Sequence, residues 1–274
     1  MHSRKTRAFS LSEFAGFGFQ IQYSETDRAS HVFEIDLHTH DVYELYVNLS
    51  GDVSFLVENQ LYTLSRGEVV LTRPGQQHHC VYRSDAVHQL FWILFDAGKN
   101  PEIAAFVERE IGTGCIRMTD AGREEFIDLC GELMREDASD ALRWGHFWRM
   151  LMLLRAGAAH RQPEEAHLPE DLARILACIE SHITEPLQVR DIARTLYISE
   201  STIQRRFLAY LGMKPAAYLR SKKLELAAKL LREGASVLDA GLGTGFSDNS
   251  HFIRIFKERY GVTPLAYRKS RENT

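Results

Sequence analysis

The last third of the chain carries one sequence pattern twice, and this internal repeat limits the possible folds more than any other feature. The second copy, HFIRIFKERYGVTPLAY, runs from His251 to Tyr267, and the first, TIQRRFLAYLGMKPAAY, runs from Thr202 to Tyr218, 49 residues earlier. Identical residues stand at corresponding positions in both copies: Arg205 and Arg254, Phe207 and Phe256, Gly212 and Gly261, Pro215 and Pro264, Ala217 and Ala266, Tyr218 and Tyr267. The chain therefore contains two copies of one structural unit.

The first copy and the residues before it predict two short helices joined by a tight turn. Residues 187–196 form the first helix, and Ser199 is a suitable N-cap for the second. The second helix places Ile203, Phe207 and Leu211 on one buried stripe and ends at Gly212. Two helices in this arrangement form a helix-turn-helix, whose second helix can enter the major groove of DNA.

The second copy predicts the same arrangement, with a first helix over residues 237–244 and a turn over residues 245–247. Asp248 caps the second helix, which buries Phe252, Phe256 and Tyr260. Between the copies, residues 215–232 form one helix of about 27 Å, at ~1.5 Å per residue. Such a helix can hold two recognition helices about one DNA turn, ~34 Å, apart.

The outward side chains of each second helix are suited to contact bases. Gln204 can bond adenine, and Arg205 can bond guanine through two hydrogen bonds. The alternative is a helical repeat used only for packing. Solenoid repeats usually need three or more units, whereas this chain has two with an outward arginine at matching positions, so we expect DNA binding.

Residues 187–268 resemble the DNA-binding domain of the AraC/XylS family of bacterial transcription regulators, most closely in GFSDNSHFIRIFKERYGVTPLAYR at residues 245–268. The resemblance implies base contacts from seven matching positions, Ser201, Gln204, Arg205, Asn249, Ser250, His251 and Arg254. The family usually has Ile-Ala before the second turn, but this sequence has Ala240-Gly241 and then Gly243. Each glycine inside a helix costs ~1 kcal/mol relative to alanine, so we expect a less rigid second helix-turn-helix.

The front half of the chain predicts strands followed by helices. From Ile35 to Phe95, short apolar segments alternate with turn residues in the rhythm of a β-barrel or sandwich. After Gly98 the apolar spacing changes to three and four residues, which predicts two helices that separate near residues 137–140. Residues 156–169 are polar and contain proline, so they are expected to form a linker.

Histidines and a glutamate in this front half resemble the two motifs of a cupin barrel. HTHDVYE supplies His38, His40 and Glu44, and GEVVLTRPGQQH supplies His78, although Val32 and Arg73 depart from the motifs. On a strand, His38, His40 and Glu44 share one face because side chains alternate. We expect them to bind a small polar effector such as a sugar in the barrel, with six candidate residues, His38, His40, Glu44, Tyr46, His78 and Trp92. No cofactor is required, but His38, His40, Glu44 and His78 can also hold a divalent metal.

Charge is divided unevenly along the chain. Residues from Leu168 onward carry 17 Lys/Arg and 12 Asp/Glu, a net charge of +5, whereas the preceding residues carry −9. An acidic front half and a basic back half suggest different partners for each. No run of about 18 apolar residues occurs, and the N-terminus has no apolar secretion segment, so we expect a cytoplasmic protein with no membrane partner. The four cysteines are scattered and are expected to be buried thiols.

Together these patterns predict an α+β chain of two domains. Residues 1–157 form a cupin-like β-barrel with flanking dimerisation helices, residues 158–169 the linker, and residues 170–274 an all-α double helix-turn-helix domain. We expect a transcription regulator rather than an enzyme, with promoter DNA, a small-molecule effector and RNA polymerase as partners. Homodimers are expected to form through the helices that carry Phe126, Leu129, Leu133 and Trp148. The alternative hypothesis is a metal-binding cupin, sensor or enzyme, fused to a DNA-binding domain.

The segment before residue 20 combines basic residues with Phe9, Phe14, Phe17 and Phe19. One interpretation is an arm that lies across the barrel mouth and releases when the effector changes. The other is that this segment adds an edge strand to the barrel.

Overall fold

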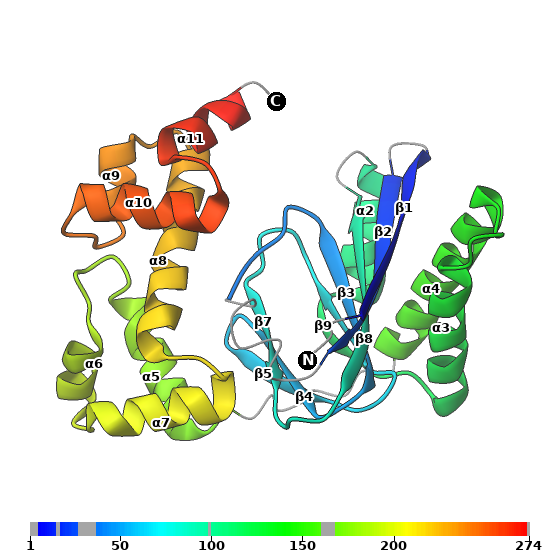
Figure 1. The fold of residues 1–274 in the computed structure, drawn as a ribbon, viewed down its shortest axis with the longest axis horizontal. Helices are drawn as coiled ribbons and strands as arrows, with labels where there is room; N and C mark the ends of the chain where they lie inside the picture. The colour runs from blue at the N-terminus through cyan, green and yellow to red at the C-terminus, as the bar shows by residue number, and fades with distance from the viewer. Residues whose placement is uncertain (1–4, 15–16, 27–36, 98–99, 160–167, 273–274) are drawn as a thin grey trace. The chain divides into compact units, whose positions relative to one another are not determined.

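The computed structural model describes residues 5–14, 17–26, 37–97, 100–159 and 168–272. Their helices and strands divide into two compact units, one that contains the strands and one built from helices (Figure 1). The predicted linker falls largely on residues 160–167, which lie outside the described residues. The expected combination of a sheet-rich N-terminal domain with an all-α C-terminal domain is confirmed.

The first unit contains, in chain order, β1 (Lys5–Phe14), β2 (Phe17–Thr26), β3 (Tyr43–Ser50), β4 (Val53–Val57), β5 (Gln60–Leu64), β6 (Val69–Thr72), β7 (His78–Tyr82), β8 (His88–Asp96), α2 (Pro101–Phe106), the π-helix η1 (Val107–Ile111), β9 (Gly114–Ile116), α3 (Asp120–Leu133) and α4 (Asp140–Ala159). Its described strands form a six-stranded sheet of order β1-β2-β8-β3-β6-β9 and a three-stranded sheet of order β5-β4-β7, with antiparallel pairing throughout. Hydrogen bonding among the described strands does not close these sheets into one barrel, which differs from the prediction.

Alternation along β3 and β8 gives the six-stranded sheet two buried faces. Tyr43, Leu45 and Val47 on one face join a core with α3 and α4, whereas Tyr46 on the other joins a core with the three-stranded sheet. Phe19 of β2 stacks on Phe147 of α4, with ring centroids 4.6 Å apart. The sheet is therefore the middle layer of this unit.

The predicted dimerisation residues are mostly part of this monomer core. Phe126 and Leu133 are fully buried and Leu129 is 9% exposed, because α3 packs on α4 and the sheet. These three side chains therefore belong to the monomer core and offer no surface to a second copy, while dimerisation through the helices that carry them stays a prediction. Trp148 is 36% exposed on the outer face of α4, and Met152, one turn later, is 37% exposed.

The N-terminal segment forms the edge of the six-stranded sheet. β1 pairs with β2, and β2 pairs in turn with β8 over nine residues, from Gly18 opposite Asp96 to Thr26 opposite His88. The edge-strand interpretation is thus correct and the arm across the barrel mouth is not. The alternation of Phe19 and Ile21 with Gln20 and Gln22 is the period-two pattern that this strand required.

The second unit contains α5 (Glu170–Ser181), α6 (Val189–Leu196), α7 (Glu200–Leu211), α8 (Pro215–Arg232), α9 (Val237–Leu242), α10 (Asn249–Tyr260) and α11 (Pro264–Glu272). It forms two helical lobes joined by α8, with α5, α6 and α7 at one end of α8 and α9, α10 and α11 at the other (Figure 1). In the first lobe Phe207 packs edge-on against Tyr218, and in the second Phe252 packs against Phe256.

Helix boundaries in this unit follow the predicted caps. The side chain of Ser199 accepts a hydrogen bond from the amide of Thr202, and Asp248 accepts hydrogen bonds from the amides of Ser250 and His251. Gly212 and Gly261 end α7 and α10 in the left-handed conformation. Local hydrogen bonding therefore accounts for where α7 and α10 begin. Tyr260, expected in the buried stripe, is only half-buried.

Of the two glycines at the end of α9, only one lies inside the helix. The helix ends at Leu242, so Gly243 is its C-cap and only Gly241 lies inside it. A Cβ on Gly241 would lie 3.0 Å from the ring of Phe252. Gly241 therefore allows α9 to pack closely against α10, and the expected lower rigidity of this helix-turn-helix stays a prediction.

All four cysteines are buried thiols, as expected, and none of them forms a disulfide within the described ranges. Burial raises the pKa of the Cys80 thiol to about 12. No helix in the described ranges is long and apolar enough to cross a lipid bilayer.

Candidate functional site

The first candidate surface is the exposed side of α7. Ile203, Phe207 and Leu211 bury one stripe of the helix, which turns Ser201, Gln204 and Arg205 outward. All three predicted contact residues of this helix are therefore exposed, within its first two turns. They offer a hydroxyl, an amide and a guanidinium to a partner.

The second candidate surface is the corresponding side of α10. Asn249, Ser250, His251 and Arg254 are all exposed. The guanidinium of Arg254 donates a 2.6 Å hydrogen bond to Glu258, one turn later on the same helix. Because this ion pair is solvent-exposed, it costs little to exchange for a contact with a base.

A buried lysine, which sequence analysis missed, joins the two lobes. Lys223 of α8 is 6% exposed, and its ammonium donates hydrogen bonds to the carbonyl oxygens of Glu185 (2.8 Å) and Gly245 (3.1 Å). Glu185 precedes α6, and Gly245 lies in the turn before α10, so one side chain ties both lobes to the connecting helix. The sequence did carry a signal for this burial, because Lys223 stands at four-residue spacing between the apolar Leu219 and Ala227 and so shares their buried face of the helix.

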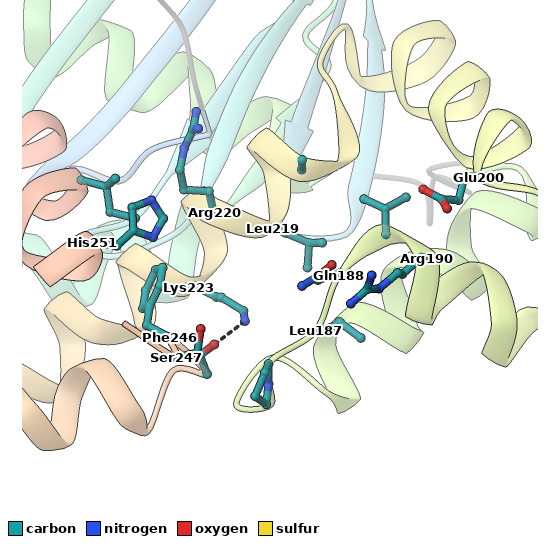
Figure 2. Close-up of a pocket in the computed structure, with 15 residues that line it drawn as sticks. Leu187, Gln188, Arg190, Glu200, Leu219, Arg220, Lys223, Phe246, Ser247 and His251 are labelled. Atoms are coloured by element: carbon teal, nitrogen blue, oxygen red, sulfur yellow. Dashed lines mark hydrogen bonds between the residues drawn. The ribbon is translucent and has the colours of Figure 1, made fainter. Parts of the chain in front are cut away.

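A cavity of about 520 Å³ lies beside this lysine, between the two lobes of the second unit (Figure 2). Its walls come from the start of α6, the start of α7, the middle of α8, the turn at residues 245–247 and the start of α10. Glu200 and His251, at the first turns of the two recognition helices, both border it.

The other candidate site consists of four side chains, His38, His40, Glu44 and His78, whose ligand atoms all come within 4.8 Å of one another. Sequence reasoning grouped these residues correctly, but its strand argument was wrong. β3 begins only at Tyr43, so both earlier histidines precede the strand. A bend at residues 41–42 brings the Nε2 atom of His40 to 2.7 Å from Glu44.

Glu44 is held as a carboxylate. Burial alone would raise its pKa, but the charge of His78 and the hydrogen bonds from both histidines hold the pKa below its usual value. The Nδ1 atom of His78 lies 2.9 Å from the carbonyl oxygen of Gln76, and its Nε2 atom lies 3.2 Å from Glu44. Both neighbours are acceptors, so this imidazole must carry two protons, or a cation must replace one of them.

The pKa of His78 agrees with this geometry. Burial lowers it, but the opposing charge of Glu44 and its hydrogen bond outweigh burial and raise it above its ordinary value. The donor set of three imidazole nitrogens and one carboxylate oxygen suits Zn²⁺ or another transition metal. Metal bonds of ~2.1 Å require ligand atoms about 3.4 Å apart, so modest side-chain movement makes these residues fit a metal.

Tyr46 and Trp92 lie deeper between the sheets. Tyr46 shares a face of β3 with Glu44 and pairs across strands with Trp92. Its hydroxyl accepts a 3.4 Å hydrogen bond from the Cys80 thiol, and Phe55 packs on its ring. The structure thus places Tyr46 and Trp92 in the apolar core beside the polar cluster.

Comparison with known proteins follows this division of the chain. A family model described as AraC-like ligand binding domain matches residues 20–197, and one described as helix-turn-helix domain matches residues 192–270. The HTH-type transcriptional activator RhaS of Escherichia coli (strain K12 / DH10B) is 25% identical over 252 residues, which are 86% of this chain and 88% of RhaS.

Solved structures are similar over part or all of the chain. A transcriptional regulator with an AraC-type DNA-binding domain from Chromobacterium violaceum is 33% identical, covers 36% of this chain and 90% of its own, and has a TM-score of 0.34. ToxT from Vibrio cholerae O395 covers 97% of both chains at 15% identity and a TM-score of 0.37. Because the ligand-binding model alone spans more than half of the chain, this protein belongs to the AraC family of transcription regulators, with an N-terminal ligand-binding domain and a C-terminal helix-turn-helix DNA-binding domain.

Proposed function

We propose that this protein activates transcription by binding promoter DNA with α7 and α10, in response to a small polar effector such as a sugar. The observation that carries the proposal is that seven hydrogen-bonding side chains are exposed on the first two turns of two recognition helices, at opposite ends of α8. Activation is the function in the printed name of RhaS. In this proposal the chain is a regulator and carries out no enzymatic reaction.

Base recognition is assigned to the seven exposed side chains. Gln204 bonds adenine, Arg205 and Arg254 bond guanine through two hydrogen bonds each, and Ser201, Asn249, Ser250 and His251 supply single contacts. α8 has 18 residues, or about 27 Å at ~1.5 Å per residue. This length suits two helices in successive major grooves on one face of DNA.

Effector binding is assigned to the polar cluster and the adjoining aromatic residues. His40, 30% exposed, is the accessible end of the cluster, Glu44 lies buried behind it, and Tyr46 and Trp92 belong to the adjoining apolar core. Sugar hydroxyls both donate and accept hydrogen bonds, so they match a carboxylate flanked by imidazoles. The effector would replace the hydrogen bond between His40 and Glu44.

A second candidate function is metal sensing, favoured by the four converging ligand atoms and by the two acceptors that face His78. In this case His38, His40, Glu44 and His78 hold one divalent cation. Isothermal titration of the metal-free protein with Zn²⁺ tests the assignment, with a Glu44→Gln variant as the control. Stoichiometric binding that this variant loses supports a metal sensor, whereas no heat in the wild type excludes one.

Homodimerisation is assigned to the outer face of α4. Ala141, Gly145, Trp148 and Met152 follow one another at spacings of four, three and four residues on this face. Such spacing forms one apolar stripe, which a second copy of the chain can cover. RNA polymerase is proposed as the partner through which DNA binding becomes activation.

Selection of binding sites from a random duplex pool by the full-length protein tests the central proposal. We expect enriched duplexes to contain two short boxes centred about one helical turn, 10–10.5 base pairs, apart. Repeating the selection with Gln204→Ala should reduce the base preference in one box, and repeating it with Arg254→Ala should reduce the base preference in the other. Absence of any enriched sequence for the wild type would contradict the proposal.

A further inference from the structure

Lys223 is a buried cation whose charge no carboxylate balances within the described part of the chain. Its hydrogen bonds go to two main-chain carbonyl oxygens, and its ammonium lies 5.8 Å from the centre of the Phe246 ring. Burial lowers the pKa of this ammonium below its ordinary value. A cation in this setting is stabilised by an anion that comes close to it.

More basic groups surround the same cavity. Arg220, one turn before Lys223 on α8, is exposed, and none of the ion pairs found among the described residues includes it. Arg190 lies in the first turn of α6, where the helix dipole adds partial positive charge. Its guanidinium is 4.0 Å from Asp191, a loose contact. Glu200 is the one acidic residue that borders the cavity among those the structure describes, so positive charge predominates.

The position of the cavity indicates the source of the anion. Figure 2 shows His251 and Glu200 on opposite sides of the cavity, and these residues belong to the first turns of α10 and α7. DNA that meets both recognition helices presents two successive major-groove segments on one face. The backbone between those segments must then cross the space between the helices, where this cavity lies.

We infer that this cavity receives a phosphate of the DNA backbone between the two major-groove segments, with Arg220 and Arg190 as its direct contacts. Lys223, buried beside the cavity, adds positive charge and holds the loops before α6 and α10 in place through its two hydrogen bonds. The inference rests on the proposed DNA-binding function and adds contacts outside the recognition helices. Such contacts position the protein on DNA without distinguishing base sequence.

A pair of full-length variants tests this inference. Arg220→Gln removes a charge at the cavity, and Lys229→Gln removes one from the same helix nine residues later. Nine residues are two and a half turns, so the control lies on the opposite face of α8. The probes are a duplex that the wild type selects from a random pool and an unrelated duplex of equal length. Equal melting temperatures of both variants and the wild type establish that folding is unchanged.

Arg220→Gln should weaken binding to both duplexes about five-fold at 0.15 M salt and reduce the slope of log K against log salt by about 1. Lys229→Gln should leave both quantities unchanged. If the Arg220 variant keeps the wild-type slope, or if it loses affinity only for the selected duplex, the phosphate contact is refuted. If the wild type selects no sequence, the proposed function itself has failed, which is a separate outcome.

Neutral methylphosphonate linkages, placed one at a time along the selected duplex, locate the phosphate. For the wild type, a neutral linkage between the two boxes should weaken binding about as much as Arg220→Gln does. For the Arg220 variant the same linkage should have little further effect, because the two changes remove one contact. If the losses of binding free energy caused by the neutral linkage and by Arg220→Gln add in full at every linkage between the boxes, the inference is overturned.

Discussion

Gly245→Ala tests whether the two lobes of the DNA-binding unit are joined as the structure shows. Gly245 has a φ of +67°, and a Cβ at this position would lie 2.0 Å from the carbonyl oxygen of Glu185. The substitution must therefore move the chain before α6 or the turn before α10. Either movement also breaks a hydrogen bond of Lys223, since this lysine bonds to both segments.

The magnitude follows from two separate costs. A left-handed conformation costs a non-glycine residue about 1 kcal/mol or more. Overpacking against main-chain atoms adds about 1–3 kcal/mol. Gly261→Ala is the matched control, because Gly261 also has a positive φ, +73°. Apart from the residues next to it in the chain, no atom of the described residues would lie within 4 Å of a Cβ at this position. The control should lose about 1 kcal/mol of unfolding free energy, and Gly245→Ala about 2–4 kcal/mol.

Two optical signals separate the units in the full-length protein. All three tryptophans, Trp92, Trp144 and Trp148, lie in the first unit, whereas the second unit is helical and dominates circular dichroism at 222 nm. One kcal/mol corresponds to about 4–8 °C for a domain of this size. Gly245→Ala should therefore lower the helical transition by at least about 8 °C and leave the tryptophan transition nearly unchanged. Equal helical transitions for both alanine variants would refute the proposed close approach.

Four further predictions concern single residues. Arg254→Ala should weaken binding to the selected duplex by ~1–3 kcal/mol and relax preference at one base pair, and an equal loss on all sequences would make Arg254 a phosphate contact. Trp148→Asp should convert dimers to monomers in sedimentation at micromolar concentration, whereas persistent dimers would exclude this face of α4. Because Cys80 has a pKa of about 12 and is buried, its thiol should not react with a disulfide reagent at pH 8 until the protein unfolds. The pKa of His78 is raised in the folded protein, so this residue contributes stability that is full below its unfolded pKa of 6.5 and is lost as pH rises through the folded pKa. The melting temperature measured by tryptophan fluorescence should therefore fall between pH 6 and 8. His78→Gln should remove this pH dependence.

The helical unit could be predicted from sequence nearly residue by residue. Its caps and glycine stops act within one or two turns, so Ser199, Asp248 and Gly212 determine the helix ends locally. The outward orientation of the seven residues followed from helical periodicity, and their choice as base contacts from the resemblance to AraC/XylS regulators. Lys223 did not, because its partners lie 38 and 22 residues away and only the folded chain brings them together.

The sheet-rich unit was less predictable because its contacts are longer in range. The four ligand residues were grouped through motif spacing, yet His38 and His40 converge through a bend rather than along a strand. Apolar residues of α3 suited an interface and a core equally well in sequence. The structure places Phe126 against the sheet and leaves Trp148 exposed. Whether hydrogen bonding closes the sheets also depends on pairings between distant strands, which spacing does not determine.

α8 is one uninterrupted helix, and this continuity has a consequence for the regulated promoters. A flexible tether would let the two recognition helices follow boxes at varied separations, but a helix fixes both distance and angle. One inserted base pair shifts the second box by about 3.4 Å along the axis and turns it by about 35° around it. Promoters under this regulator should therefore tolerate base changes between the boxes while conserving their number. A single-nucleotide deletion there should abolish regulation as fully as the loss of an entire box.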